Sequence, residues 1–216
     1  MKRIAIIGAG AYGQQILTFI QNDSMEKFSV VGFFDDYAQI GSTIAGLPVL
    51  GSISDVVIKY TNDEFDCVFI AIGYKHFEFK EKVYDTIKGI IPLANIICKH
   101  AFIHPTAKLG EGVFIGNFVV INMGAELEDN VTVTLHSIIN HDSLVKKHTF
   151  ISTRVTTAGN VVIGGKCFIG VASVISDGVH IVDSVWLSPA TIVVKDIKNA
   201  GHYMSAGVRI LSVPTL

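Results

Sequence analysis

The residues of this 216-residue chain best suited to chemistry are Asn140-His141-Asp142. An imidazole can take a proton from an attacking amine or hydroxyl near neutral pH, and a carboxylate beside it can fix its tautomer and stabilise the imidazolium. Gly159 lies eighteen residues after His141, and Asn160 lies eighteen residues after Asp142. If residues eighteen apart lie one above another, a base, a carboxylate and an approachable backbone N–H meet in one patch. Acyl transfer needs these groups, because the N–H can receive the developing oxyanion of a thioester.

A six-residue repeat after His100 supplies that spacing. Stepping by six from Ile103 to Val193 gives sixteen positions, and all are Ile, Leu or Val except Thr157. The repeat is typical of a parallel β-helix, in which three hexapeptides form a triangular coil of eighteen residues around an aliphatic interior. In such a coil His141 falls outside the inward positions, so we expect its imidazole to point out of the prism.

Other polar side chains of the repeat give weaker signals. His136 stacks on Arg154 in the same scheme, as an anion or substrate contact or as part of a surface ladder. His148, in the irregular Lys146-Lys147-His148 stretch, is expected to be exposed. The histidines occupy different hexapeptide positions, so we predict no metal site. The three cysteines fit buried thiols better than disulfides or zinc ligands; they are Cys67, Cys98 and Cys167.

The first hundred residues alternate short strands with helices, which predicts parallel βαβ units. We expect about three strands and three helices, with a turn or small hairpin over 43–51. The strands are expected at 2–8, 29–35 and 67–73 and the helices at 12–22, 53–61 and 77–88.

The segment Gly8-Ala9-Gly10-Ala11-Tyr12-Gly13 joins the first strand to the first helix and fits G-x-G-x-x-G. Its glycines allow a tight turn and close approach of the backbone to a phosphate. Asp35 and Asp36 end the second strand, where a carboxylate can contact a ribose or a base. Gly73-Tyr74-Lys75 ends the third strand at the same edge, so Lys75 faces either a phosphate or solvent.

Three interpretations of this segment are open. A dinucleotide-dependent dehydrogenase would need about twice as much fold, so a mononucleotide, or the nucleotide end of a larger substrate, fits better. The third interpretation is a glycine-rich turn that only packs the helix on the strand.

Composition excludes several classes of protein. Half of the residues are hydrophobic and only 17% are charged, with a mean hydropathy of +0.49, so the chain is not disordered. No apolar run reaches the eighteen residues of a membrane span. A net charge of −2 gives no footprint for nucleic acid. We interpret the start, Met1-Lys2-Arg3, as mature sequence and expect a cytoplasmic protein with no membrane insertion.

Taken together, these residues resemble the bacterial sugar acyltransferases of the NeuD/PglD type, within the left-handed β-helix, hexapeptide-repeat superfamily. The likeness covers nearly the whole chain. It rests on the glycine-rich loop with the two aspartates, and on four further segments. These are Ala71-Ile72-Gly73, Ile103-His104-Pro105-Thr106-Ala107, Asn140-His141-Asp142 and Ala158-Gly159-Asn160-Val161-Val162-Ile163-Gly164.

The resemblance implies an N-terminal Rossmann-like nucleotide-binding domain over 1–98 and a left-handed β-helix acyltransferase domain with a C-terminal tail over 99–216. It also implies a homotrimer that binds acetyl-CoA between neighbouring prisms. The implied catalytic residues are His141, Asp142 and Gly159, and the implied acetyl-CoA contacts are Gly159, Asn160, Gly165 and Lys166. The implied nucleotide-sugar contacts are Gly8, Gly10, Tyr12, Asp35, Asp36, Gly73 and Lys75.

Some family positions differ here. The usual I-G-D/E after the base is Val145-Lys146-Lys147, a second histidine found in some members is Phe150, and an asparagine before the base is Thr134. The closing G-x-P-A-K pattern is only faintly present as Ser205-Ala206-Gly207-Val208-Arg209.

The function expected is N-acetylation of a nucleotide-linked amino sugar, of the 4-amino-4,6-dideoxyhexose type, in bacterial surface-glycan synthesis. Two alternatives remain: O-acetylation of a sialic acid or another sugar, and a non-catalytic trimer that binds nucleotide sugars. The chain's unusual apolarity fits a β-helix with a filled interior whose outer faces are buried against two sister subunits.

Overall fold

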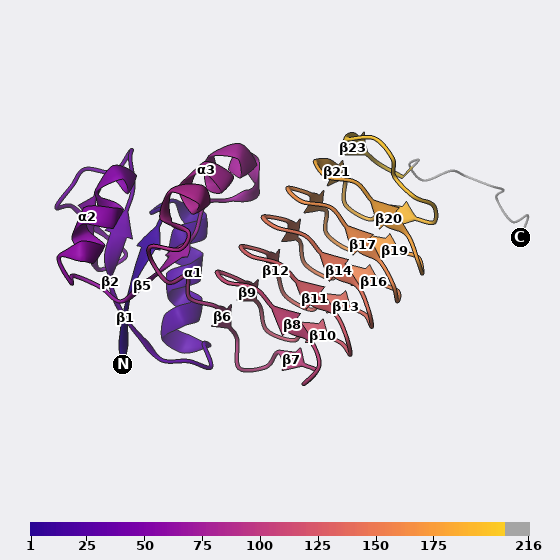
Figure 1. The fold of residues 1–216 in the computed structure, drawn as a ribbon, viewed down its shortest axis with the longest axis horizontal. Coiled ribbons are helices and arrows are strands. Elements are labelled where there is room, and N and C mark those ends of the chain that lie inside the picture. The colour runs from indigo at the N-terminus through magenta and orange to yellow at the C-terminus, as the bar shows by residue number, and fades with distance from the viewer. Residues whose placement is uncertain (206–216) are drawn as a thin grey trace, which may run out of the picture.

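The structure, a computed structural model, describes residues 1–205 as two adjoining parts (Figure 1). An α/β part comes first and a β-helix follows it. Of the faint closing pattern, Ala206 to Arg209 lie outside the described residues.

The N-terminal part is a five-stranded sheet in the order β3-β4-β2-β1-β5, parallel except for β3. Its strands are β1 (Lys2–Ile7), β2 (Phe28–Phe34), β3 (Thr43–Ile44), β4 (Leu47–Gly51) and β5 (Cys67–Ile70). The expected hairpin is β3-β4, turning at Ala45 and Gly46, which both have positive φ. The expectation of about three strands was too low, because β4 also pairs in parallel with β2.

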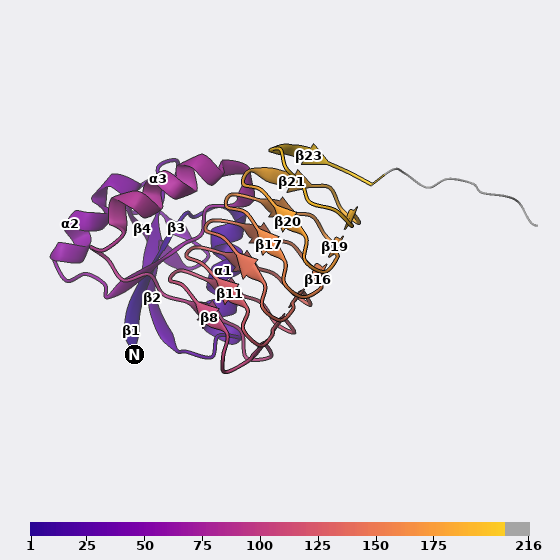
Figure 2. The same cartoon turned by 45° about the vertical axis from the view of Figure 1, so that its right-hand side comes forward.

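Helices cover both faces of this sheet. On one face, α1 (Ala11–Asn22) buries Ile16 and Ile20 against strand residues such as Ile6. On the other face lie α2 (Val56–Thr61) and α3 (Phe77–Ile87), preceded by the short 3₁₀ turns η1 (Ile53–Asp55) and η2 (Tyr74–His76) (Figure 2). The carboxyl ends of β1, β2 and β5 therefore meet at one edge, as the sequence predicted.

The β-helix has three parallel sheets, in which pairing strands lie eighteen residues apart except for β21 and β23, which lie sixteen apart. The seven-stranded sheet contains β6 (Ile96–Ile97), β9 (Phe114–Ile115), β12 (Thr132–Val133), β15 (Phe150–Ile151), β18 (Phe168–Ile169), β21 (Val185–Leu187) and β23 (Gly201–Tyr203). The six-stranded sheet contains β7 (Phe102–Ile103), β10 (Val120–Ile121), β13 (Ile138–Ile139), β16 (Thr156–Thr157), β19 (Val174–Ile175) and β22 (Ile192–Val193). The third sheet contains β8 (Lys108–Leu109), β11 (Glu126–Leu127), β14 (Leu144–Val145), β17 (Val162–Ile163) and β20 (His180–Ile181).

The predicted fold class, a Rossmann-like domain followed by a left-handed parallel β-helix, is thus confirmed. Since β6 already pairs with β9, the β-helix sheet begins just before residue 98. The division of the chain at that residue stays a prediction.

Each corner of the prism uses the same backbone conformation. Every sixth residue from Gly112 to Ala190 has a positive φ, between +53° and +68°. Most of these residues are not glycine. Asp142 and Asn160 belong to this group, and Asp and Asn adopt a positive φ more readily than most other residues with a side chain. The corner that carries the predicted base is therefore a fixed element of the coil.

The interior is the predicted aliphatic stack. From Ile115 to Leu187 its members are at most 2% exposed. Thr157, the one exception in sequence, is also fully buried. Its hydroxyl accepts a hydrogen bond from the Asn140 N–H at 2.9 Å, so the exception serves the corner that carries His141.

Only one of the three sheets is covered by the N-terminal part. Phe114 on the seven-stranded sheet contacts Phe19 of α1, and Thr132 on the same sheet contacts the Tyr12 hydroxyl. His141 instead follows β13 and precedes β14, at the corner between the six-stranded and third sheets. The glycine-rich loop and His141 therefore lie on opposite sides of the prism.

Candidate active site

His141 and Asp142 meet at an exposed corner. The His141 Nδ1 lies 3.0 Å from Asp142 Oδ2, and the two side chains are 46% and 55% exposed. Because a carboxylate only accepts hydrogen bonds, this contact assigns the proton to Nδ1. Nε2 is then left with its lone pair, as a general base requires. The imidazole points out of the prism, as predicted.

Gly159 lies directly against this imidazole. A Cβ built at Gly159 would overlap the His141 ring atoms Cε1 and Nε2. The backbone N–H of Asn160 donates to the His141 carbonyl at 2.9 Å, which fixes the two coils in register. Within residues 1–205, no group accepts a hydrogen bond from the Gly159 N–H. A base and a free donor thus adjoin, which is the arrangement that acyl transfer uses.

Asn140 holds this corner from behind. Its Oδ1 accepts hydrogen bonds from Asn122 Nδ2 at 2.8 Å and from the His141 N–H at 3.3 Å, while its own N–H donates to Thr157. Sequence reasoning missed the role of Thr157, although its signal was the break in the aliphatic count.

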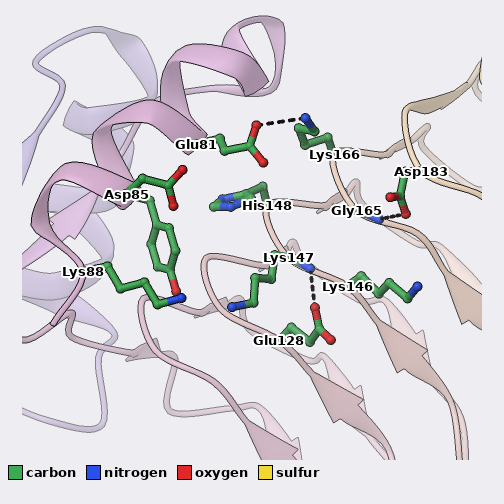
Figure 3. A pocket seen from close by; sticks show the side chains of 11 residues that line it. Glu81, Asp85, Lys88, Glu128, Lys146, Lys147, His148, Gly165, Lys166 and Asp183 are labelled. Atoms are coloured by element: carbon green, nitrogen blue, oxygen red, sulfur yellow. Dashed lines mark hydrogen bonds and ion pairs between the residues drawn. The ribbon is translucent and has the colours of Figure 1, made fainter.

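Gly165 and Lys166 lie at a different corner, the one facing α3 (Figure 3). Gly165 N–H donates to Asp183 Oδ1 at 2.8 Å. Lys166 Nζ lies 2.9 Å from Glu81 and 3.4 Å from Glu78, both on α3. The structure therefore separates these two residues from His141, and their predicted contact with acetyl-CoA stays a prediction.

The same corner corrects the expectation for His148, which is 4% exposed rather than solvated. Its Nδ1 lies 3.0 Å from Asn130 Nδ2, and its ring meets Tyr84 of α3 edge-on. Burial lowers the pKa of His148 to about 4. Lys80 of α3 is buried as well and donates to the Asn130 carbonyl, and burial lowers the pKa of its amine to about 7. The sequence repeat did not predict the burial of either side chain, because it does not indicate which part of the chain covers a corner of the prism.

Two glycines of the N-terminal loop are required by packing. Gly8 has a φ of +105°, and a Cβ there would lie 2.8 Å from the Ala71 carbonyl oxygen. A Cβ at Gly13 would overlap the Gly8 carbonyl. These two positions support the interpretation of the loop as a packed strand-to-helix turn.

Gly10 and Gly73 are different, because a Cβ at either would meet no atom within 4 Å. Both have extended backbone that any residue adopts. Gly10 is the N-cap of α1, and no side chain caps this helix end. The first N–H groups of α1 are therefore open to an anion.

The two aspartates are already engaged by backbone. Asp35 accepts hydrogen bonds from the N–H groups of Ala9, Tyr37 and Ala38, between 2.8 and 3.0 Å. Asp36 Oδ1 accepts one from the Ile53 N–H at 2.8 Å. Asp35 thus ties the glycine-rich loop to the end of β2, and a contact of either residue with substrate stays a prediction.

A groove with a volume of about 430 Å³ opens between this loop and the β-helix. It is lined by Ala11, Tyr12, Gln15, Gly73, Tyr74 and Phe150. A second hollow shares four of these residues and continues to Thr134 and Thr153. Tyr12 therefore faces both the loop and the β-helix, whereas Lys75 is exposed and does not line the groove.

Two kinds of feature are absent from residues 1–205. No group of three or more His, Cys, Asp or Glu side chains is arranged to hold a metal ion. No helix in this part of the chain is both long and apolar enough to cross a membrane. The cytoplasmic location stays a prediction.

Comparison with protein families matches the two parts separately. Residues 3–87 match the PglD N-terminal domain, and residues 97–203 match the GMPPB C-terminal domain. A curated relative, an uncharacterised protein of Acanthamoeba polyphaga mimivirus, is 29% identical over 126 residues. That match covers 58% of this chain and about a quarter of the relative's length.

Solved structures share the fold along nearly the whole chain. The acetyltransferase domain of PglB from Neisseria gonorrhoeae, in complex with acetyl coenzyme A, has a TM-score of 0.84 at 23% identity over 94% of this chain and 96% of that chain. PerB from Caulobacter crescentus, in complex with CoA and GDP-perosamine, has a TM-score of 0.84 at 21% identity over 95% of each chain. WeeI from Acinetobacter baumannii is more distant, with a TM-score of 0.54 at 19% identity over 90% of this chain and 95% of that chain.

The N-terminal match gives the resemblance seen in the sequence an independent basis, and the shared fold extends it to the β-helix. Residues 3–87 thus match the PglD N-terminal domain, and the chain as a whole shares the fold of the PglB acetyltransferase domain and of PerB.

Proposed function

We propose that this protein transfers the acetyl group of acetyl-CoA to the amine of a nucleotide-linked amino sugar, of the 4-amino-4,6-dideoxyhexose type, in surface-glycan synthesis. The observation that carries the proposal is the His141 imidazole, held by Asp142 at 3.0 Å and lying against Gly159, whose N–H has no acceptor within the described residues. The structure of PerB, which shares the fold, holds CoA and GDP-perosamine together.

In the proposed reaction, His141 Nε2 accepts the proton that leaves the amine as its nitrogen attacks the thioester carbon. The Gly159 N–H stabilises the oxyanion of the tetrahedral intermediate. His141 then returns the proton to the departing thiolate, so the products are an amide and a free thiol. Asp142 keeps the proton on Nδ1 throughout and stabilises the imidazolium. Holding both substrates side by side supplies proximity, so no covalent enzyme intermediate is needed.

The nucleotide end of the substrate would bind the N-terminal part. The open N–H groups at the start of α1, with Gly10 and Gly73 leaving room for a phosphate, support this assignment. The adjoining groove, bounded by Tyr12, Tyr74 and Phe150, then receives the sugar.

This arrangement requires a second copy of the chain. The groove opens beside the seven-stranded sheet, whereas His141 lies at the opposite corner of the same prism. A single sugar cannot reach both in one chain. We therefore propose that the groove of one subunit meets the His141 corner of the next, in a homotrimer.

The outer face of the six-stranded sheet is the surface that fits such an assembly. Its outward positions are apolar except for Thr156; they are Phe102, Val120, Ile138, Val174 and Ile192. Phe102, Val174 and Ile192 are exposed, at 54%, 44% and 64%. An apolar sheet face of this length is unusual for a monomer.

The test is thiol release from acetyl-CoA with a panel of UDP-, dTDP- and GDP-linked amino sugars, comparing wild type with His141→Ala. We expect release with one nucleotide sugar and a loss of about 10²- to 10⁴-fold in kcat for the variant, with the assembly intact. Release with free sialic acid would instead select O-acetylation, and nucleotide binding without release would select the non-catalytic trimer. A variant with near wild-type turnover would exclude His141 as the base.

A further inference from the structure

A column of aromatic side chains runs up the outer face of the seven-stranded sheet. Phe150, Phe168 and Trp186 occupy matching positions on β15, β18 and β21. The ring centroids of Phe150 and Phe168 are 5.9 Å apart, and those of Phe168 and Trp186 are 4.3 Å apart. Tilted and offset rings at these separations attract one another.

One side chain of the N-terminal part reaches all three rings. The Tyr74 ring lies 5.0 Å from Phe150, 4.4 Å from Phe168 and 5.5 Å from Trp186. Tyr74 begins η2, directly after Gly73 at the carboxyl end of β5. The edge of the sheet assigned above to the nucleotide is therefore fastened to the β-helix by Tyr74 as well as by Tyr12, whose ring centroid lies 5.9 Å from that of Phe150.

Trp186 differs from its neighbours in this column. Phe150 and Tyr74 line the groove, but Trp186 lines neither the groove nor the hollow that continues it. Its rings touch Tyr74 and Phe168, with His202 further up the column at 6.1 Å. Trp186 can therefore influence the groove only through other rings: directly through Tyr74, and through Phe168 to Phe150.

We propose that Trp186 is a positioning residue for the nucleotide-sugar substrate: it holds the Tyr74 ring, and thereby sets the Gly73–Tyr74 backbone against the groove. The inference rests on the proposed function, because it assigns the groove to the nucleotide sugar. It adds a residue that contacts no substrate and that lies far from the loop in sequence.

The prediction separates binding from chemistry. Trp186→Ala removes one ring contact from Tyr74 and one from Phe168, which itself contacts Tyr74. It leaves the His141 corner untouched, since that corner lies on the other side of the prism. We expect the KM for the nucleotide sugar to rise about tenfold, from the usual size of aromatic pair contacts. The kcat and the KM for acetyl-CoA should stay within about twofold of wild type.

Two further variants keep the test specific. Trp186→Phe retains a ring against Tyr74 and should restore the KM to within about threefold of wild type. His202→Ala is the matched control, because His202 contacts Trp186 from the other side and does not contact Tyr74. We expect it to leave the KM unchanged. The melting temperature of each variant shows whether the fold survives.

Binding gives a second readout that does not need turnover. Trp186 is the only tryptophan of the chain, so titration of wild type with UDP, dTDP or GDP should change its emission. Calorimetric titration with the nucleotide that binds should give a Kd about tenfold weaker for Trp186→Ala. If no acetyl transfer occurs but this Kd shifts, the proposed function fails and the inference stands.

Several outcomes would overturn the inference. One is a folded Trp186→Ala variant that transfers acetyl groups with an unchanged KM for the nucleotide sugar, and another is a loss in that variant that is confined to kcat. The third is a Trp186→Phe variant whose KM for the nucleotide sugar is as high as that of Trp186→Ala. Absence of any nucleotide binding by wild type would overturn both this inference and the assignment of the groove.

Discussion

Replacing Gly159 with alanine tests the His141 corner through one methyl group. The position has no left-handed φ, so alanine adds no backbone strain there. The added Cβ would, however, overlap the Cε1 and Nε2 atoms of His141. To restore ordinary van der Waals contact at roughly 3.5 Å, the imidazole must withdraw by about 1 Å.

That displacement sets the expected magnitude. A reacting group misplaced by about 1 Å can cost about 10²-fold in rate, so kcat for thiol release from acetyl-CoA should fall about 10²-fold. The free energy of unfolding should not fall, because Gly→Ala at a compatible position stabilises by about 0.4–1 kcal/mol through the unfolded chain. Steady-state kinetics and thermal melts on the same preparation measure both.

A double-mutant cycle decides whether the methyl group acts through the imidazole. In a His141→Ala background the added Cβ has no ring to displace, so Gly159→Ala should then cost less than about threefold. If the substitution costs the same 10²-fold without His141, it acts on the oxyanion or on acetyl-CoA instead. A single variant with kcat within about threefold of wild type would refute the geometric reasoning altogether.

Three further predictions concern the support of this corner and of the corner beneath α3. Asp142→Asn should lower kcat about tenfold, less than in a buried triad because the carboxylate is 55% exposed; Asp142→Glu should recover part of the rate. Thr157→Val keeps the shape of the stack but orphans the Asn140 N–H, so denaturant melts should show a loss of about 1–3 kcal/mol. The third prediction concerns His148. Its pKa is 6.5 in the unfolded chain and about 4 in the folded protein. As the pH falls from 6.5 to 4, the unfolded chain therefore binds the proton first. Wild type should therefore lose up to about 3 kcal/mol of unfolding free energy between pH 6.5 and pH 4, and melts of His148→Gln across the same range should lack that loss.

The repeat and the carboxyl edge could be predicted from the sequence because both follow from local pattern. A six-residue period fixes which residues point inward, and eighteen-residue stacking brings His141 beside Gly159 without any knowledge of tertiary structure. The pattern could not say which of the three outer faces the N-terminal part would cover. The predicted exposure of His148 was therefore wrong, and the predicted contact of Lys166 with acetyl-CoA stays a prediction. The surroundings of both residues are set by α3 rather than by their own coil.

The outward positions of the covered, seven-stranded sheet nevertheless differ in sequence from those of the third sheet. Outward positions of the seven-stranded sheet include Phe114, Phe150, Phe168 and Trp186, whereas those of the third sheet include Lys108. Large rings on one outward column indicate a partner there, because an exposed stack of this size would be costly in water. In the structure that partner is α1 with Tyr74.

The two sides of the prism are held by different means, which gives the proposed enzyme separable functions. The His141 corner is fixed by the coil itself, through the recurring positive φ and the hydrogen bonds of Asn140 and Thr157. The groove is fixed by side-chain contacts between the two parts of the chain, above all those of Tyr74. Substitutions at the corner should therefore change kcat, and substitutions in the aromatic column should change the KM for the nucleotide sugar. A column variant that lowered kcat alone would mean that the two sides are coupled through the prism, and that rigid stacking of the coils does not isolate them.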